Sequence, residues 1–102
     1  MVYYRVALFV PHAQTNAVRE AMKTAYASAE NKKPFFSFSS VGVGRVVSNE
    51  GKEEELKGER IECMCPKNAL PNLLAAIVEV YPKAESMIEV TELSSWPPYT
   101  VG

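Results

Sequence analysis

The sequence has little of what marks a disulfide-stabilised, membrane-spanning or nucleic-acid-binding protein. Among 102 residues there are only two cysteines and one histidine, so a disulfide framework and a histidine-rich metal centre are both disfavoured. The 11 basic and 12 acidic side chains nearly cancel, whereas a nucleic-acid binder usually carries a basic field. No apolar run approaches the roughly 20 residues that span a bilayer, and residues 1–12 lack the features of a signal peptide. We expect an unprocessed cytoplasmic protein with no nucleic-acid or membrane partner.

The length limits the number of domains. A chain of about 100 residues buries about two thirds of the surface that it exposes when unfolded, which supplies one hydrophobic core. Hydrophobic residues make up 47% of this chain. We therefore expect a single domain over residues 1–102, with its core over about residues 2–93 and a tail over residues 94–102.

The hydrophobic pattern predicts alternating strands and helices. Apolar positions recur every three or four residues over residues 13–29, and again from Leu70 to Tyr81, so both segments are expected to be helices. Asn31 is a candidate C-cap of the first helix and Asn68 a candidate N-cap of the second. Strands are expected over residues 2–10, 35–41, 43–48, 60–65 and 87–93, with a tight turn or bulge at Gly42 to Gly44.

The charged segment over residues 49–58 has almost no apolar content and is flanked by glycines, so we expect a solvated loop there. The order strand, helix, strand or hairpin, strand, helix, strand is typical of the ferredoxin-like fold. In this α+β fold two helices cover one face of an antiparallel sheet.

The other face of that sheet should be an interface. The positions opposite the core-facing residues mix large apolar groups with charges of both signs: Tyr3, Arg5, Ala7, Phe9, Arg60, Glu62 and Met64. Such a mixture is more typical of a protein–protein interface than of a solvated surface, so we expect a homo-oligomer. Glu62 would need a partner there, which Arg5, Arg45 or Arg60 can supply within or between subunits.

Three motifs carry a resemblance to a known family. They are Phe38-Ser39-Ser40-Val41-Gly42-Val43-Gly44, Arg60-Ile61-Glu62-Cys63-Met64-Cys65-Pro66, and Tyr81-Pro82. In this order they resemble the PII-like domain inserted in YqfO-type proteins of the Nif3 family, and more distantly the sequence is similar to CutA-type divalent-cation tolerance proteins and PII signal proteins. The resemblance implies a homotrimer that binds a ligand or a partner in clefts between subunits. The residues that it favours as ligand-binding are Gly42, Gly44, Arg45 and Glu62, together with the acidic segment, and it implies no cofactor.

The sequence also departs from that family. Its relatives usually end the second helix with His-Pro-Tyr-Glu, where this chain has Tyr81-Pro82-Lys83-Ala84-Glu85. The dinuclear metal site of the parent proteins belongs to flanking domains, so hydrolase chemistry is not implied. No serine, histidine and acid form a nucleophilic motif, and no carboxylates are paired, so we expect no enzymatic activity.

Two alternatives remain open: a divalent-metal binding or tolerance protein of CutA type, with His12, Cys63, Cys65 or acidic residues as its ligands, and a purely structural domain that trimerises a larger complex. Alternate residues of a strand lie about 7 Å apart, which is too far for a relaxed disulfide, and two thiolates are fewer than a structural zinc site needs. We therefore expect both cysteines to lie in the core and His12 to be exposed or to cap a helix. The Trp96-Pro97-Pro98-Tyr99 segment is either a proline-rich ligand for another protein or a tail packed on its own or a neighbouring subunit.

Overall fold

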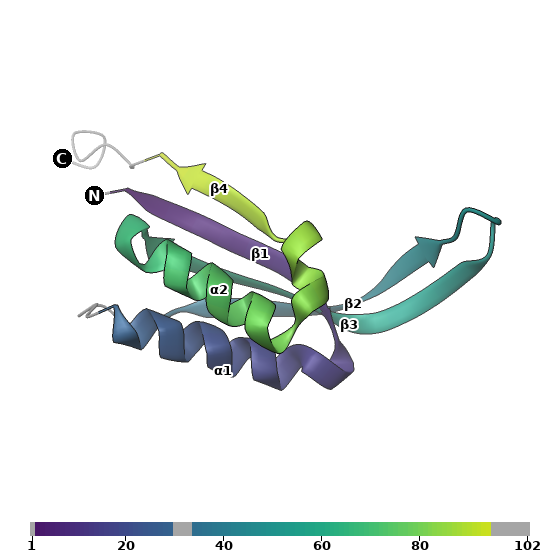
Figure 1. Ribbon diagram of the computed structural model, residues 1–102, viewed down its shortest axis with the longest axis horizontal. Coiled ribbons are helices and arrows are strands. Elements are labelled where there is room, and N and C mark those ends of the chain that lie inside the picture. The colour runs from purple at the N-terminus through teal and green to yellow at the C-terminus, as the bar shows by residue number, and fades with distance from the viewer. Residues whose placement is uncertain (1, 30–33, 95–102) are drawn as a thin grey trace.

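The computed structural model describes residues 2–29 and 34–94. Four strands form one antiparallel sheet in the order β2-β3-β1-β4: β1 (Tyr3–Pro11), β2 (Ser37–Val47), β3 (Glu53–Pro66) and β4 (Glu89–Leu93). Helices α1 (His12–Ser28) and α2 (Leu70–Val80) connect them, with short 3-10 turns at Lys67–Ala69 and Pro82–Ser86. The predicted ferredoxin-like α+β fold is confirmed (Figure 1).

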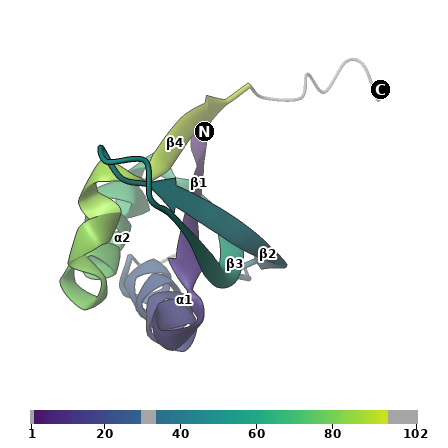
Figure 2. The same ribbon diagram turned by 90° about the vertical axis from the view of Figure 1, so that its right-hand side faces the viewer.

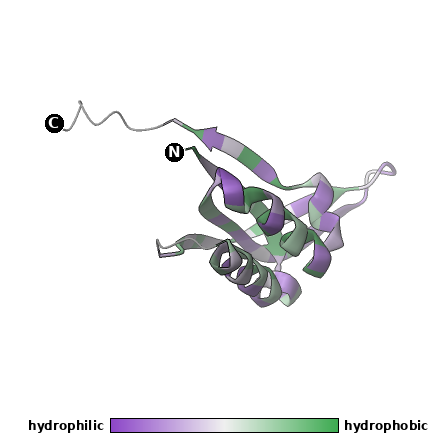
Figure 3. Cartoon of the chain, turned by 60° about the vertical axis from the view of Figure 1, so that its left-hand side comes forward, coloured by the Kyte–Doolittle hydropathy of each residue, from purple (hydrophilic) through white to green (hydrophobic). Residues whose placement is uncertain are grey.

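Both helices lie on the same side of the sheet (Figure 2). The core between the two layers consists of alternate residues of β1 and β3 and the inner stripe of each helix: Val6, Leu8, Val10, Ile61, Cys63, Cys65, Val18, Met22, Leu73 and Ile77. Hydrophobic and hydrophilic segments alternate along the elements (Figure 3), because successive strand residues point to opposite faces and helical residues recur every 3.6 positions. The predicted core-facing stripes are therefore confirmed.

The ends of the second helix differ from the prediction. Asn68 lies within the 3-10 turn, and no side chain caps the helix, which begins at Leu70. Pro71 occupies the first turn, where a residue without an N–H leaves no donor unsatisfied. Beyond the helix, the amide of Met87 donates to the carbonyl of Ala84 at 2.8 Å, so the last strand begins at Glu89 rather than at residue 87. Asn31 lies outside the described residues.

The largest correction concerns the loop predicted over residues 49–58, of which residues 53–58 belong to a strand. Strand β3 begins at Glu53, which pairs with Val47 of β2, and pairing continues without a break past Gly42. The turn is confined to Ser48–Lys52, where the amide of Gly51, at φ 84°, donates to the carbonyl of Ser48 at 2.9 Å. The expected turn or bulge at Gly42 to Gly44 is therefore wrong as well, because both glycines lie inside a continuous strand.

We call the outer part of this hairpin, residues 41–47 of β2 and 53–59 of β3, the arm. It projects beyond the helices (Figure 1), and the chain is accordingly 54 Å long but only 30 Å and 21 Å in its other dimensions. Strands β2 and β4 form the two edges of the sheet. Within the described residues, neither helix has the length and apolar character needed to cross a membrane.

Candidate functional site

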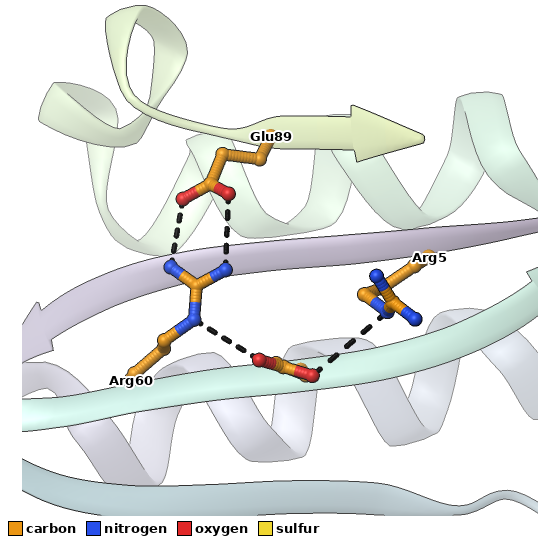
Figure 4. Close-up of polar contacts among 4 residues, drawn as sticks. Arg5, Arg60 and Glu89 are labelled. Carbon is orange, nitrogen blue, oxygen red and sulfur yellow. Dashed lines mark hydrogen bonds and ion pairs between the residues drawn. The ribbon is translucent and has the colours of Figure 1, made fainter. Parts of the chain in front are cut away.

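The centre of the sheet face away from the helices, here called the open face, carries a network of four charged residues. Arg60 donates from both terminal nitrogens to the two carboxylate oxygens of Glu89, at 2.7 and 3.0 Å, and from Nε to Glu62 at 3.0 Å. The other oxygen of Glu62 lies 3.9 Å from Nε of Arg5. Figure 4 shows these four side chains bridging β1, β3 and β4. Glu62 therefore has the expected partners Arg5 and Arg60, within its own chain.

The charges of this network are paired with one another and cancel. Hydrogen bonds from Arg60 lower the pKa of the Glu89 carboxyl, and those to Glu89 and then Glu62 raise the pKa of the Arg60 guanidinium. Two positive and two negative groups leave no net charge, so the centre of the open face offers little attraction to an anion. Ala7, which pairs with Glu62 and Glu89 on this face, is only 1% exposed. Long charged side chains beside a small residue shield it from water.

One end of the open face is apolar. Phe36, Phe38 and Met64 are 63%, 56% and 45% exposed, and with Arg5, Glu62 and Cys63 they line a pocket of about 250 Å³. Neighbouring strand residues of the same parity share a face, so these groups form one continuous patch beside the charged network. We call it the apolar end of the open face.

The arm holds the other predicted site residues. Gly42 and Gly44 face the open side, and Arg45 lies on the opposite side, 3.3 Å from Glu55 and 3.9 Å from Glu53. Arg45 is therefore not the partner of Glu62. Seven residues of β3 separate Glu55 from Glu62, a distance of about 23 Å along a strand. The sheet brings Gly42, Gly44 and Arg45 together on the arm and leaves Glu62 in the charged network.

The residues of the alternative metal site are not brought together. Cys63 and Cys65 are buried under the helices, as expected, and His12 is exposed at the start of α1. Burial, and then the neighbouring Cys65, raise the pKa of the Cys63 thiol to about 12, and burial raises that of Cys65. Protonated thiols bind metals poorly. The described part of the chain contains no group of three or more residues able to hold a metal ion.

Sequence reasoning missed two contributors to the open face. Glu89 was placed in a strand but not in the network, although its alternation with Val90 puts it on the face opposite the core. Phe36 was treated only as part of a strand, although its spacing of two from Phe38 places both on one face. The alternation of residues along a strand could have shown the face on which Glu89 and Phe36 lie. The residues that they contact on neighbouring strands depend on the strand order, which the alternation does not give.

The strand order and the two helices on one side of the sheet define a ferredoxin-like α+β domain. No family model matches the chain. A Halalkalibacterium halodurans protein named GTP cyclohydrolase 1 type 2 homolog is 30% identical to this chain over 104 residues, an alignment that covers 90% of this chain. A Bacillus cereus protein related to NIF3 matches it with a TM-score of 0.75 and 28% identity over 92% of the chain. The predicted similarity to Nif3-related proteins is confirmed.

The chain corresponds to only 27% and 26% of the lengths of these two proteins. More distant structures share the fold alone. The Bacillus subtilis GlnK–ATP complex matches over 99% of this chain and 90% of its own, with a TM-score of 0.59 and 14% identity. The divalent cation tolerance protein of Thermus thermophilus matches over 93% and 85%, with a TM-score of 0.56 and 15% identity. The predicted likeness to PII and CutA domains is thus confirmed at the level of fold.

Proposed function

We propose that the chain is a small oligomeric PII-like binding or regulatory module. It assembles as a homotrimer through the arm and binds a small-molecule or protein ligand in clefts between subunits, beside Gly42, Gly44 and Arg45. The chain itself performs no catalysis, and the enzyme name of its Halalkalibacterium relative refers to a protein of which it matches about a quarter.

The observation that carries this proposal is the unshielded state of the arm. Apart from the contact of Arg19 on α1 with Glu59 at the base of the arm, no helix of the described residues packs on it (Figure 1). Its valines are 47% to 76% exposed: Val41, Val43, Val46 and Val47. An isolated two-stranded hairpin is marginally stable in water, and an exposed apolar edge strand is a template for pairing with another chain. Contacts with neighbouring copies would shield these valines and hold the arm in place.

The glycines support a ligand site on the arm. A Cβ atom built on Gly42 would meet nothing within 4 Å, so a ligand can approach the main chain there directly. Arg45 adds a cationic group on the opposite side of the arm, three residues along β2 from Gly42. At the end of the arm, Val46, Ser48, Glu50, Lys52, Glu53 and Glu54 line a pocket of about 440 Å³, which a neighbouring subunit would close into a cleft.

Native mass spectrometry of the wild-type protein and two matched variants tests the assembly. Val43→Asp puts a charge on the arm, and Val80→Asp puts the same charge on the outer surface of α2, where Val80 is 40% exposed. We expect a trimer mass for the wild type and for Val80→Asp, and a single-chain mass for Val43→Asp, with circular dichroism confirming that each is folded. A single-chain mass for the dilute wild-type protein would end the proposal.

A thermal-shift screen of nucleotides and small metabolites tests the ligand site. A ligand that binds only the folded form at a hundredfold excess over its Kd stabilises it by about 2.7 kcal/mol, which corresponds to a shift on the order of 10 °C for a domain of this size. Arg45→Ala should abolish the shift and Lys23→Ala, on α1, should preserve it. A shift that is equal in both variants would place the ligand elsewhere.

Titration with Cu²⁺ and Zn²⁺ tests the CutA-type alternative. Five residues of β3 separate Cys63 from Gly58, which pairs with Pro11 next to His12, so the histidine and the thiols are about 17 Å apart along the sheet. We expect no stoichiometric binding. Binding that is lost in both His12→Ala and Cys63→Ser would instead favour the metal-handling function.

A further inference from the structure

The pocket at the apolar end of the open face is built from two rows of side chains that cross the sheet. Arg5 of β1 pairs directly with Met64 of β3, and Glu62 of β3 pairs with Phe38 of β2. Phe36, which precedes β2, lines the same pocket. The two rows lie about 7 Å apart along the strands. The space between them is about 250 Å³, on the body of the sheet and away from the arm.

The walls of this pocket are largely apolar and aromatic. Phe36, Phe38 and Met64 are each at least 45% exposed, and contact with water is unfavourable for such large apolar side chains. Aromatic rings and a thioether both gain from contact with a further aromatic ring. The Trp96-Pro97-Pro98-Tyr99 segment lies outside the described residues, and none of these walls comes from it. The walls favour a ligand with a flat aromatic face.

Arg5 adds a planar cation on the β1 side of the pocket. Its guanidinium makes no hydrogen bond within the described residues, and its one ion pair there, with Glu62, is long at 3.9 Å. Arg60 by contrast makes three hydrogen bonds (Figure 4). The face of a guanidinium that is not committed to carboxylates stacks well on an aromatic ring. Arg5 therefore also favours an aromatic ligand.

Glu62 supplies a hydrogen-bond acceptor to the same pocket. Its Oε2 accepts a hydrogen bond from Nε of Arg60 at 3.0 Å. Its Oε1 accepts none within the described part of the chain and lies 3.9 Å from Nε of Arg5. An N–H group on the edge of a ligand ring can donate to this oxygen, and hydrogen bonds to an ionised acceptor are the stronger kind.

Charge and size narrow the class of ligand. The two arginines and two glutamates of the network cancel, so a ligand with a net charge gains little attraction on this face. Pockets for drug-sized ligands usually measure roughly 300–1,000 Å³. A pocket of about 250 Å³ is suited to a smaller molecule of one or two fused rings. A flat, neutral ring system with one N–H group meets all of these conditions.

We propose that this pocket binds a small, neutral heteroaromatic molecule of the indole type. The ring packs against Phe36, Phe38 and Met64. Its face stacks on the guanidinium of Arg5, and its N–H donates to Oε1 of Glu62. This goes beyond the proposed function, because the pocket lies on the body of the sheet, whereas the ligand site proposed above lies on the arm.

A titration of the isotope-labelled wild-type protein with indole, followed by nuclear magnetic resonance, tests the proposal. N-methylindole is a matched probe that lacks only the N–H donor. We expect indole to shift the amide resonances of the residues that line the pocket and to leave those of the arm unchanged. N-methylindole should bind roughly tenfold or more weakly, because it cannot donate a hydrogen bond to Glu62.

Two variants each remove one contact. Arg5→Gln removes the stacked cation and should weaken indole binding about fivefold. Phe38→Ala removes an aromatic wall and should weaken it by a similar factor. Two controls, Lys23→Gln on α1 and Val80→Ala on α2, change exposed side chains away from the pocket and should leave the affinity unchanged. The spectrum of each variant shows whether it is folded, and the two probes test the wild-type site without any substitution.

Three outcomes would overturn the inference. The first is the absence of any change in the pocket resonances at saturating indole. The second is equal affinity for indole and N-methylindole, or equal affinity of the wild type and Arg5→Gln for indole. The third is a change in the pocket resonances when the protein is diluted without indole, since a neighbouring copy then covers the pocket. Because Val43→Asp tests the assembly by mass and indole tests the pocket by resonance shifts, either proposal can fail without the other.

Discussion

Gly58 stands at the point where the arm leaves the body of the sheet, and it leaves no room for a side chain. A Cβ atom on Gly58 would lie 2.2 Å from the carbonyl oxygen of Val10, 2.9 Å from the Cα of Pro11 and 2.9 Å from the ring of Phe9. Two of these three atoms belong to the main chain, which cannot move aside as a flexible side chain can. We therefore predict that Gly58→Ala distorts the contact between β1 and β3.

The expected loss of stability follows from these distances. Overpacking of a well-packed site typically costs 1–3 kcal/mol, and a clash with two main-chain atoms belongs at the upper end, about 3 kcal/mol. Domains of this size are stable by about 5–15 kcal/mol, so this loss is a large fraction of the total. It corresponds to a decrease in melting temperature of roughly 15 °C.

Gly42 provides a matched control, since it is paired with Gly58 across the two strands. A Cβ atom on Gly42 meets nothing within 4 Å, and among the glycines that the structure describes only Gly51 has a positive φ. Gly42→Ala is therefore expected to be neutral, or to stabilise the fold by about 0.5 kcal/mol by restricting the unfolded chain.

Urea denaturation followed by circular dichroism measures both variants, with the protein concentration held constant because association contributes to apparent stability. The result that would refute the reasoning is a Gly58→Ala variant as stable as Gly42→Ala. It would mean that the close approach of β1 to β3 at this point relaxes without a free-energy penalty.

Three further predictions concern the polar groups. Arg19→Ala should destabilise the fold by about 1.5 kcal/mol in urea denaturation, since its guanidinium joins α1 to the half-buried Glu59 of β3 and to the exposed Ser39 of β2. Lys23→Ala removes an exposed pair and should change the stability by under about 0.5 kcal/mol; equal effects would contradict this. Because burial raises the pKa of Cys63 from 9.0 to about 12, the native thiol should hold roughly a thousandfold less thiolate at pH 7 than the denatured chain and should react more slowly with an aromatic disulfide. The stability that this shift contributes should be complete below pH 9 and lost as the pH rises toward 12; rapid reaction of the native protein would show the thiol to be accessible. The hydrogen bond from Arg60 holds the pKa of Glu89 below its ordinary 4.5, so the stability that this pair contributes is present above pH 4.5 and lost as the pH falls through the lowered value. Arg60→Ala should return the pKa of Glu89, measured by NMR titration, toward 4.5; an unchanged value would exclude Arg60 as the cause.

The strongest periodic signals in the sequence predicted local structure well. The spacing of Leu73, Ile77 and Tyr81 places all three in the core, because a helix must bury an apolar stripe of that period. Alternation along the first strand placed Arg5 and Ala7 on the face away from the helices. These are consequences of backbone geometry within one element, and they need no knowledge of its neighbours.

The charged residues 53–58 show where such local reasoning fails. Their composition favours a solvated loop, yet they form a strand because β2 offers paired main-chain partners from Gly42 to Val47. Main-chain hydrogen bonds do not depend on side-chain type, and both faces of the arm are open, so charged side chains stay hydrated within a strand.

The sequence by itself determined the two helices, the ferredoxin-like order and the face on which each residue of β1 and of residues 60–65 of β3 lies, since each depends on short-range periodicity. Only the tertiary structure decided that Glu62 pairs with Arg60, which also binds Glu89. Arg45, the other candidate partner of Glu62, pairs instead with Glu53 and Glu55. Strand order and register bring together residues that are far apart in the chain, and no local pattern encodes those distances.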